Sequence, residues 1–568
     1  MACLLSTAVS AVEPSPKLSG RFLHITDIHP DEHYLDGAAV STSCHAVLGS
    51  VDATGQGAFN LPARASGKER VLTVEDMQIL RPGVTENDGI SAPGTAGHYG
   101  APYTICDSPL SLANATFEWI DNNLVGGIDF VVWTGDNARH DSDNTHPRTQ
   151  DQINEMNNAM AKRALQAFPP GPDGRRLPVI PSLGNNDVYP HNIMYPGPSA
   201  ILDHYADIWS EWIPKSQMST FRLGGYYSSE VIPGKVAVFG LNTLFFYIHN
   251  VAVDGCKKRH EPGTEEMDWL EAELKSLRSR KMVAYLTGHV PPEKKSYSAS
   301  CHSRYTKLAL EYQDVIVGHL YGHANIDHFF LLSTNKKGKD RYETLEDGDQ
   351  DQDQDMDMDI DDEDKDDEYD PFHILGLGTY LDSLWQQYDS IPKKVKSSTY
   401  AIVQVSPSVV PAYHPTLRVF DYQLADNSTV TLSTDPADED DDVEDEMDDH
   451  ELEEYFSAQL NNDNEFVRAM EQDKKKGDKK PSYPNPVPTN AFGFPMAYTQ
   501  YWTNLTLANH GPTTPEFEVE YRTREDYGLA NLGVSEYLGL AKRISKDKQL
   551  KKVYLKRMVV QTGAENTL

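Results

Sequence analysis

Five short clusters of residues that bind metal ions occur in a fixed order between residues 21 and 330. Aspartate, histidine and asparagine side chains supply the carboxylate, imidazole and amide groups that hold divalent cations in proteins. One such cluster alone is typical of a helix cap or a turn. Five in one fixed order are hard to obtain by accident and predict a metal-binding site. The clusters are Asp27-Ile28-His29, Gly135-Asp136-Asn137, Gly184-Asn185-Asn186-Asp187, Gly288-His289 and Gly322-His323-Ala324-Asn325-Ile326-Asp327-His328.

Short apolar runs would place these clusters at the ends of β-strands. Four clusters directly follow such a run, and strand ends in an open α/β sheet converge on one crevice. Apolar residues at helical spacing predict helices at Leu110–Asn123, at Met267–Leu277 after a Thr264 cap, and at Val534–Ile544. This alternation predicts an α/β layered fold. Strands or extended segments are expected at Phe22–Thr26, Phe130–Thr134, Val179–Leu183, Val236–Leu241, Met282–Thr287, Asp314–Val317, His373–Leu375, Tyr400–Val405, Thr416–Tyr422, Tyr501–Leu507 and Glu516–Tyr521.

Two acidic runs carry most of the net charge of -35. Segment 346–370 holds 16 acidic residues and one lysine, and segment 435–454 holds 14 acidic residues with no lysine or arginine. Sequence of this composition cannot bury apolar surface, so both runs are expected to be disordered and solvated. The rest of the chain is only mildly acidic, which is compatible with an anionic substrate.

The composition also suggests domain boundaries. We expect a metal-binding core at 21–342, an acidic disordered insertion at 343–370, a β-rich remainder of the same domain at 371–433, a low-complexity linker at 434–488 with a short helix near Leu452–Met470, and a small C-terminal unit at 489–568. Segment 1–20 is interpreted either as a weak signal peptide or as the remnant of an N-terminal signal-anchor. Its apolar stretch is short and lacks a basic start.

The cysteines and glycosylation sequons indicate a secretory compartment. Of the five cysteines, Cys3 lies in the N-terminal segment and none of the others has zinc-finger spacing. Two disulfides between sequence neighbours are predicted, Cys44–Cys106 and Cys256–Cys301, with free buried thiols as the alternative. Disulfides and glycans are typical of lumenal or secreted proteins. The sequons begin at Asn114, Asn427 and Asn504.

The ordered motifs Asp-x-His, Gly-Asp, Gly-Asn, Gly-His and Gly-His-x-x resemble the calcineurin-like metallophosphoesterase superfamily over roughly residues 21–330. The resemblance implies a layered β-sandwich flanked by helices, with two divalent metal ions (Mn, Mg, Co or Zn). Carried over to this chain, the first ion would be held by Asp27, His29 and Asp136. Asp136 would bridge to the second ion, whose ligands would be completed by Asn185, His289 and His323.

One departure from the superfamily pattern concerns the first metal ion. The last motif usually ends Gly-His-x-His, and Asn325 stands at its final position. An amide oxygen can bind a cation, but it is a weaker and harder ligand than imidazole. We therefore expect the first site to favour Mg²⁺ or Mn²⁺. His328, three residues further along the chain, is the alternative ligand.

A second departure concerns the proton donor to the leaving group. Asn186 stands where the superfamily usually has histidine, and an amide cannot donate a proton in this way. His140, four residues after Asp136, is the candidate replacement, with His191 in reserve and a structural role as the alternative. Arg139 is a candidate phosphate clamp, with an exposed arginine as the equal alternative.

Longer runs narrow the resemblance to one branch. Thr26–Asp31, Gly288–Pro292 and Glu520–Tyr527 resemble acid sphingomyelinases and their relatives. Gly184–Asp187 and Gly322–His328 resemble the fungal endopolyphosphatases, where both departures recur as family features. This resemblance implies a vacuolar enzyme that hydrolyses inorganic polyphosphate internally. It implies no nucleic-acid partner, and membrane attachment only through an N-terminal anchor.

Two other interpretations of the sequence remain open. A sphingomyelinase-like or nucleotide phosphodiesterase is the alternative enzyme, although sphingomyelinases carry a cysteine-rich saposin domain ahead of Asp-x-His and Asp27 leaves no room for one. The alternative of another class is an inactive scaffold whose acidic runs bind basic partners. Against the scaffold, six of the seven usual ligand positions keep their usual residue type.

Overall fold

The computed structural model describes residues 19–47, 94–171, 174–334, 377–424, 482–511 and 514–566. All described helices and strands belong to one compact unit within residues 1–425 and 484–568. Several sequence expectations lie outside the described residues and stay predictions. These are segment 1–18, both acidic runs, the strand at His373–Leu375, the helix near Leu452–Met470 and the sequon at Asn427.

One six-stranded sheet has the order β14-β13-β12-β1-β4-β5. Strands β1, β4 and β5 are parallel. Strand β12 pairs antiparallel with β1, β13 with β12, and β14 with β13. The clusters at Asp27, Asp136 and Asn185 follow β1, β4 and β5, so they meet at one edge of this sheet. The bounds are β1 (Ser19–Ile25), β4 (Phe130–Trp133), β5 (Val179–Pro181), β12 (Thr416–Gln423), β13 (Pro495–Trp502) and β14 (Glu518–Arg522).

A second six-stranded sheet has the order β10-β11-β9-β8-β7-β6. Its inner strands β7, β8, β9 and β11 are parallel, and β6 and β10 close the two edges in antiparallel pairing. Because β8 and β9 run the same way, His289 and His323 follow at the same edge. The bounds are β6 (Tyr227–Ile232), β7 (Val236–Gly240), β8 (Val283–Thr287), β9 (Ile316–Tyr321), β10 (His328–Leu332) and β11 (Ala401–Val405).

The two sheets pack face to face around an aromatic core. Phe22 of β1 stacks on Phe130 of β4 and Phe420 of β12, with ring centroids 4.6 and 4.7 Å apart. Tyr285 of β8, in the other sheet, meets the Phe22 ring edge-on at 5.1 Å. All four rings are buried. Contacts of this kind stabilise aligned sheets, and they confirm the expected layered β-sandwich.

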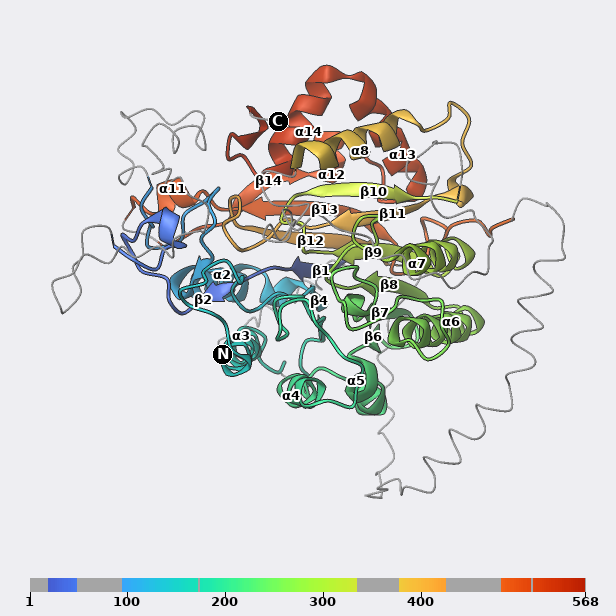
Figure 1. The fold of residues 1–568 in the computed structure, drawn as a ribbon. Helices are drawn as coiled ribbons and strands as arrows, with labels where there is room; N and C mark the ends of the chain where they lie inside the picture. The colour runs from blue at the N-terminus through green and yellow to red at the C-terminus, as the bar shows by residue number, and fades with distance from the viewer. Residues whose placement is uncertain are drawn as a thin grey trace, which may run out of the picture. The chain divides into compact units, whose positions relative to one another are not determined.

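Helices flank the two sheets (Figure 1). Helix α2 packs on α3, α6 packs on α7 and on β8, and α8 and α13 pack on each other and on β10 and β11 respectively. Among the described helices, none is long and apolar enough to cross a membrane. The bounds are α2 (Leu110–Asn123), α3 (Gln150–Ala167), α4 (Ala200–Ile208), α5 (Met218–Gly224), α6 (Pro262–Arg280), α7 (Ala299–Glu311), α8 (Leu377–Asp389), α13 (Val534–Lys546) and α14 (Lys548–Met558).

Most predicted elements form, with boundary differences that have local causes. Helix α6 begins at Pro262 rather than after Thr264, because proline at the first helical position has a preset backbone angle and no amide to leave unpaired. The segment expected to be extended over Tyr501–Leu507 leaves β13 at Trp502. It then enters the short helix α11 (Leu505–Ala508), whose first turn is capped by the Asn504 side chain.

The C-terminal segment 489–568, where the sequence predicted a small unit, contributes two strands to the sandwich. Strands β13 and β14 extend the first sheet beyond β12, which would otherwise be an open edge. Arg418 of β12 donates to Asp327 Oδ1 at 2.6 Å, and the Tyr521 hydroxyl of β14 donates to the other oxygen of Asp327. This segment therefore anchors the loop that carries the last metal-binding cluster.

The two disulfides form as predicted, Cys44–Cys106 and Cys256–Cys301. All four cysteines are buried. The first disulfide ties the loop that contains Cys44 to the residues that immediately precede β3 (Ser108–Pro109) and α2. It therefore fixes the position of the neighbouring Asp107.

Candidate dinuclear metal site

Five predicted ligands lie on left-handed backbone, which non-glycine residues adopt rarely and mainly at functional sites. Two glycines allow the loops to approach closely. A Cβ on Gly184 would overlap the Asp136 carboxylate, and a Cβ on Gly322 would overlap Thr26 and Asp27. The sharp turns at the strand ends thus direct the ligand side chains into one place. The five ligands and their φ angles are Asp27 (50°), His29 (41°), Asp136 (59°), His323 (69°) and Asn325 (57°).

The first group of ligands consists of Asp27, His29 and Asp136, all fully buried. His29 Nε2 lies 3.6 Å from Asp27 Oδ1 and 3.3 Å from Asp136 Oδ2. The other ring nitrogen, Nδ1, donates to the Ala138 carbonyl at 2.9 Å. Asp27 Oδ2 accepts from the Thr26 hydroxyl at 2.5 Å, and Asp27 Oδ1 has no hydrogen-bond partner among the described residues. Asp27 Oδ1, His29 Nε2 and Asp136 Oδ2 therefore face a common centre.

The second group shares Asp136 with the first. His289 Nε2 lies 3.0 Å from Asp136 Oδ2, 2.8 Å from Asn185 Oδ1 and 3.1 Å from His323 Nδ1. His289 Nδ1 donates to the Thr134 carbonyl at 2.8 Å, which fixes the ring so that Nε2 points into the site. Asp136 Oδ2 is therefore the atom that the two groups have in common, as the sequence predicted for the bridging carboxylate.

The atoms that converge in both groups are electron-pair donors, and they require positive charge between them. Burial opposes ionisation of Asp136, but His289 and His29 hold the pKa of its carboxyl well below the usual value. Burial lowers the pKa of His289, while Asp136 raises it to about 9. A proton on His289 supplies this charge in part. Two divalent cations would supply it fully, so the residues fit the predicted pair of ions.

The two candidates for the last ligand have different surroundings. Asn325 lies in the same loop as His323, two residues further along the chain. Its Oδ1 has no hydrogen-bond partner in the described part of the chain. His328 is buried at the start of β10, where Nδ1 contacts the Ile326 carbonyl at 3.2 Å and Nε2 contacts the Tyr380 hydroxyl at 2.5 Å. Burial lowers the pKa of His328 to about 3. This geometry favours Asn325, whose role as a ligand stays a prediction.

Asn186 and Asp187 hold the bridging carboxylate in place. The backbone N–H and the side-chain amide of Asn186 donate to the two oxygens of Asp136, at 2.8 and 2.9 Å. Asp187 accepts from the backbone N–H groups of Gly184, Asp136 and Asn137 at 2.9, 2.8 and 2.7 Å. The geometry thus gives Asn186 a positioning role. Asp187 lay within a motif that we identified, but its bridging of two loops has no local sequence signal.

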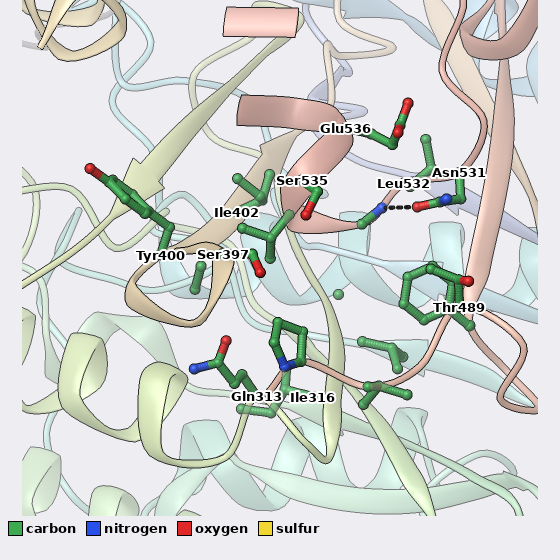
Figure 2. Close-up of a pocket in the computed structure, with 18 of the residues that line it drawn as sticks. Gln313, Ile316, Ser397, Tyr400, Ile402, Thr489, Asn531, Leu532, Ser535 and Glu536 are labelled. Atoms are coloured by element: carbon green, nitrogen blue, oxygen red, sulfur yellow. Dashed lines mark hydrogen bonds between the residues drawn. The ribbon is translucent and has the colours of Figure 1, made fainter. Parts of the chain in front are cut away.

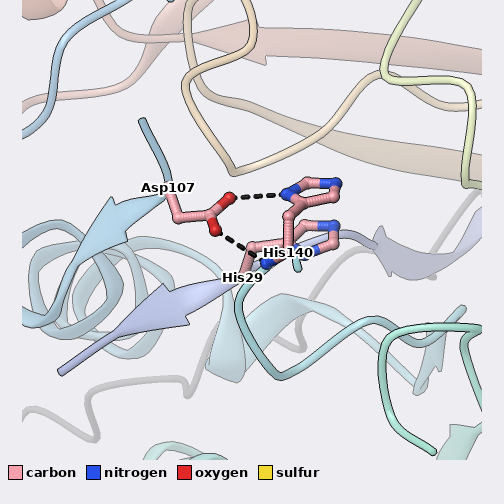
Figure 3. A group of neighbouring side chains, drawn as sticks. All are labelled: His29, Asp107 and His140. Carbon is pink, nitrogen blue, oxygen red and sulfur yellow. Dashed lines mark hydrogen bonds and ion pairs between the residues drawn. The ribbon is translucent and has the colours of Figure 1, made fainter. Parts of the chain in front are cut away.

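His140 stacks on His29, with ring centroids 3.8 Å apart. Its Nδ1 and its backbone N–H donate to the two oxygens of Asp107 at 2.6 and 2.7 Å (Figure 3). The Asp107 carboxyl is buried, yet His140 holds its pKa below the usual value. Because Nδ1 is engaged, proton exchange with a substrate would use Nε2. Asp107 was not predicted from the sequence, where the only nearby signal is the predicted disulfide at Cys106.

Arg139 and His191 lie near the site in supporting positions. Arg139 is buried, and its guanidinium donates to the carbonyls of His140 and His146. This arrangement favours a role in holding the loop rather than the predicted role as a phosphate clamp. Because Arg139 is buried, it is not the exposed arginine that was the alternative. The Asn185 side-chain amide donates to His191 Nε2 at 3.0 Å, which turns Asn185 Oδ1 towards the second group of ligands. Both catalytic assignments stay predictions.

A separate cavity of about 270 Å³ lies at the other end of β9 from His323. Figure 2 shows Gln313 and Ile316 on one side, and Ile402 together with Ser535 and Glu536, at the start of α13, on another. None of the predicted metal ligands lines this cavity. It therefore plays no part in the site described above.

The fold and the paired ligand groups define a class of protein, the calcineurin-like phosphoesterases. The match to this family covers residues 20–327, which contains every predicted ligand from Asp27 to Asn325. The remaining strands of the sandwich, β10 to β14, lie beyond the matched region and complete both sheets.

Comparison with characterised proteins identifies the subgroup. The chain is 36% identical to an endopolyphosphatase of Cryptococcus neoformans, over 89% of this chain and 77% of that protein. It is 32% identical to endopolyphosphatases of Neurospora crassa and Saccharomyces cerevisiae, over 93% and 96% of this chain and 78% and 86% of those proteins. The chain belongs to the endopolyphosphatase family of calcineurin-like phosphoesterases.

Proposed function

We propose that this protein hydrolyses phosphoanhydride bonds within inorganic polyphosphate chains. The observation that carries the proposal is the pair of ligand groups that share Asp136 Oδ2, since such a pair suits hydrolysis at phosphorus. The names of the relatives supply the substrate class.

The chain's own residues would divide into two cation sites. Asp27, His29, Asp136 and Asn325 would hold the first cation, and Asp136, Asn185, His289 and His323 the second. Such a pair of cations polarises the phosphoryl group and supplies a nucleophile from water near neutral pH. The mixture of carboxylate, amide and imidazole ligands suits Mn²⁺, Mg²⁺, Co²⁺ or Zn²⁺.

Around the cations, the protein orients ligands and moves a proton. Asn186 and Asp187 hold the bridging carboxylate, and Asp107 holds His140. We assign proton delivery to the leaving oxygen to His140 Nε2. A polyphosphate leaving group is already acidic, so this step should matter less than it does for an alkoxide. That difference accounts for an asparagine at position 186, where a second proton donor would gain little.

We propose that the protein works in the lumen of the vacuole, reached through the secretory pathway. The two disulfides support an oxidising compartment during folding. Asn114 is exposed on α2 and Asn504 is partly exposed before α11, so both are accessible for glycosylation. Attachment to the vacuolar membrane would use an N-terminal signal-anchor.

The test is the length of the products formed from long-chain polyphosphate by the purified protein. After removal of metal by EDTA, activity should return with one or more of Mn²⁺, Mg²⁺, Co²⁺ and Zn²⁺, and chains of intermediate length should appear early. Early release of orthophosphate alone would contradict internal cleavage. Hydrolysis of nucleotide phosphodiesters or sphingomyelin with no action on polyphosphate would contradict the substrate class.

A further inference from the structure

A second cluster of imidazoles and carboxylates lies outside the dinuclear site. His45 Nδ1 lies 2.6 Å from Asp143 Oδ2, and His146 Nδ1 lies 2.9 Å from the same oxygen. The three ligand atoms all lie within 4.8 Å of one another. His33 is adjacent, with its ring centroid 4.8 Å from that of His146. None of these side chains takes part in either group of ligands around Asp136.

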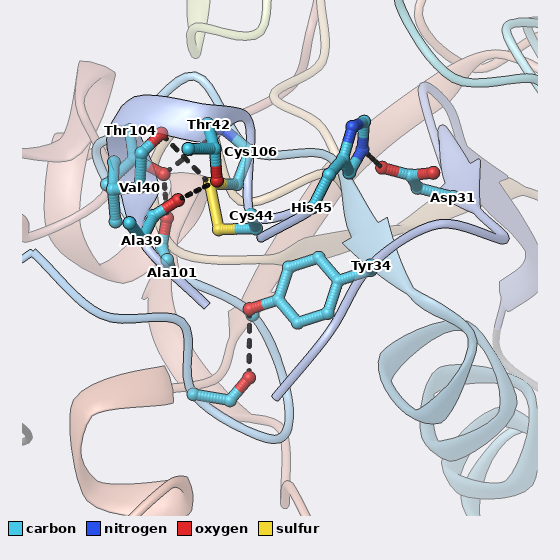
Figure 4. Close-up of a disulfide and its surroundings, with 12 residues drawn as sticks. Asp31, Tyr34, Ala39, Val40, Thr42, Cys44, His45, Ala101, Thr104 and Cys106 are labelled. Atoms are coloured by element: carbon cyan, nitrogen blue, oxygen red, sulfur yellow. Dashed lines mark hydrogen bonds and ion pairs between the residues drawn. A yellow bond between two sulfur atoms is a disulfide. The ribbon is translucent and has the colours of Figure 1, made fainter. Parts of the chain in front are cut away.

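Neighbouring residues orient His45 as they would orient a metal ligand. His45 Nε2 donates to Asp31 Oδ2 at 2.7 Å, and Asp31 is only 3% exposed (Figure 4). This contact leaves Nδ1 directed at Asp143. In metal sites, a ligating imidazole usually donates its other N–H to a carboxylate in this manner. The disulfide from Cys44, the preceding residue, to Cys106 fixes the backbone of His45.

Asp143 is oriented in the same way. Its Oδ1 accepts from the backbone N–H and the hydroxyl of Thr145 at 2.8 and 2.6 Å. Oδ2 is therefore the oxygen that faces His45 and His146. The Asp143 carboxylate is also partly buried, with its side chain 12% exposed. Three ligand atoms with fixed directions thus converge from two loops, with His146 on the solvent side.

We propose that His45, Asp143 and His146 bind a third divalent cation, of the class of Mn²⁺, Co²⁺ or Zn²⁺. Two ligand atoms at about 2.1 Å from one cation and at a right angle are about 3 Å apart. The separations of 2.6 and 2.9 Å around Asp143 Oδ2 are close to that value. Two imidazoles with one carboxylate suit borderline transition metals better than Ca²⁺. The site is distinct from the dinuclear site and does not depend on the proposed function.

The competing state has a proton in place of the cation. A doubly protonated His45 would donate to both Asp31 and Asp143, and the cluster would then be an ion-pair network with no metal. Cation binding and this network differ in stoichiometry, because only the former adds a tight equivalent of metal that depends on His146.

Metal stoichiometry of the full-length chain distinguishes the two states. Protein stripped of metal with EDTA is dialysed against Mn²⁺ or Zn²⁺, and the tightly bound metal is counted. We expect three equivalents for the wild type and two for His146→Gln, whose side chain is 42% exposed and so should not disturb folding. The matched control is His98→Gln, a histidine 58% exposed beside Asp36, which should keep three. The acidic runs are unchanged in all variants, so any weak metal binding by these runs is the same in each protein and does not affect the comparison.

A second variant tests the same site from its buried side. Asp31→Asn should weaken the third equivalent about 10- to 100-fold while the first two remain tight. Circular dichroism spectra should match those of the wild type. Two tight equivalents in the wild type, or three in His146→Gln, would overturn the proposal and leave the cluster as an ion-pair network.

Discussion

Asp107 binds His140 through both of its carboxylate oxygens, one to the ring Nδ1 at 2.6 Å and one to the backbone N–H at 2.7 Å. Asp107 lies next to the disulfide at Cys106, whereas His140 belongs to the loop after β4. The two contacts fix the position of a ring that stacks on the predicted metal ligand His29. They also leave Nε2 as the nitrogen through which His140 would act on a substrate.

Replacing His140 should affect substrates according to their leaving groups. His140→Ala is expected to lower kcat/KM on polyphosphate by about 10²-fold, the low end of general acid–base contributions, because the leaving group is acidic. The loss on a simple alkyl phosphodiester should be larger. Equal losses on both substrates would indicate phosphate binding by His140, and no loss on either would indicate a purely structural residue.

Asp107→Asn tests whether Asp107 acts through His140. The amide keeps the shape but removes the charge that stabilises the imidazolium. We expect kcat to fall, less than in His140→Ala, with the same larger effect on the alkyl phosphodiester and with KM nearly unchanged. The comparison variant is Asp121→Asn on the exposed face of α2, which should behave as the wild type. A loss that does not depend on the substrate would show that Asp107 merely supports the fold.

Asp136→Asn should lower phosphohydrolase activity by several orders of magnitude without unfolding the protein. Asp136 Oδ2 is common to both ligand groups, and an amide cannot supply the bridging negative charge. EDTA should abolish the activity of the wild type in the same way, and added metal should restore it only to the wild type. Undiminished turnover in Asp136→Asn would falsify the dinuclear site.

Glu520→Gln should remove part of the pH dependence of stability. Burial raises the pKa of the Glu520 carboxyl to about 8, and this outweighs its hydrogen bond from Gln561 at 2.8 Å. Between pH 4.5 and 8 the folded state keeps a proton that the unfolded state releases. The free energy of unfolding of the wild type should therefore fall as pH rises, by at most about 1.4 kcal/mol per pH unit from this group. Urea unfolding at pH 5, 6.5 and 8 should show a shallower slope for Glu520→Gln, and parallel slopes would contradict the assignment.

Arg418→Met should destabilise the protein by about 3–5 kcal/mol, since it leaves the buried Asp327 carboxylate without its ionic partner. The double variant Arg418→Met with Asp327→Leu should recover part of that loss, because it removes both charges. Chemical unfolding of the three proteins provides the comparison. A double variant that is less stable than Arg418→Met would show that Asp327 contributes mainly through the Tyr521 hydroxyl rather than through Arg418.

Much of this protein could be predicted from its sequence because the signals are local. Each ligand cluster follows the apolar strand that positions it, so Asp27, Asp136 and His289 are found by reading along a short stretch of chain. Apolar runs and periodicity located most strands of the two sheets and the helices α2, α6 and α13, and the pairing of cysteines with their sequence neighbours was correct. The resemblance of the ordered motifs then indicated the family, which the comparisons confirm.

Only the tertiary structure decided which distant side chains support those ligands. Asp107 and His140 are 33 residues apart, His45 and Asp143 are 98 apart, and Asp327 and Arg418 are 91 apart. A polar side chain that is satisfied by a distant partner has no repeating local pattern, so it resembles an ordinary surface residue in the sequence. The same holds for β13, which pairs with β12, and for β14, which pairs with β13. Local patterning determined the predicted ligands and most of the strands, whereas long-range pairing determined the contacts that position them.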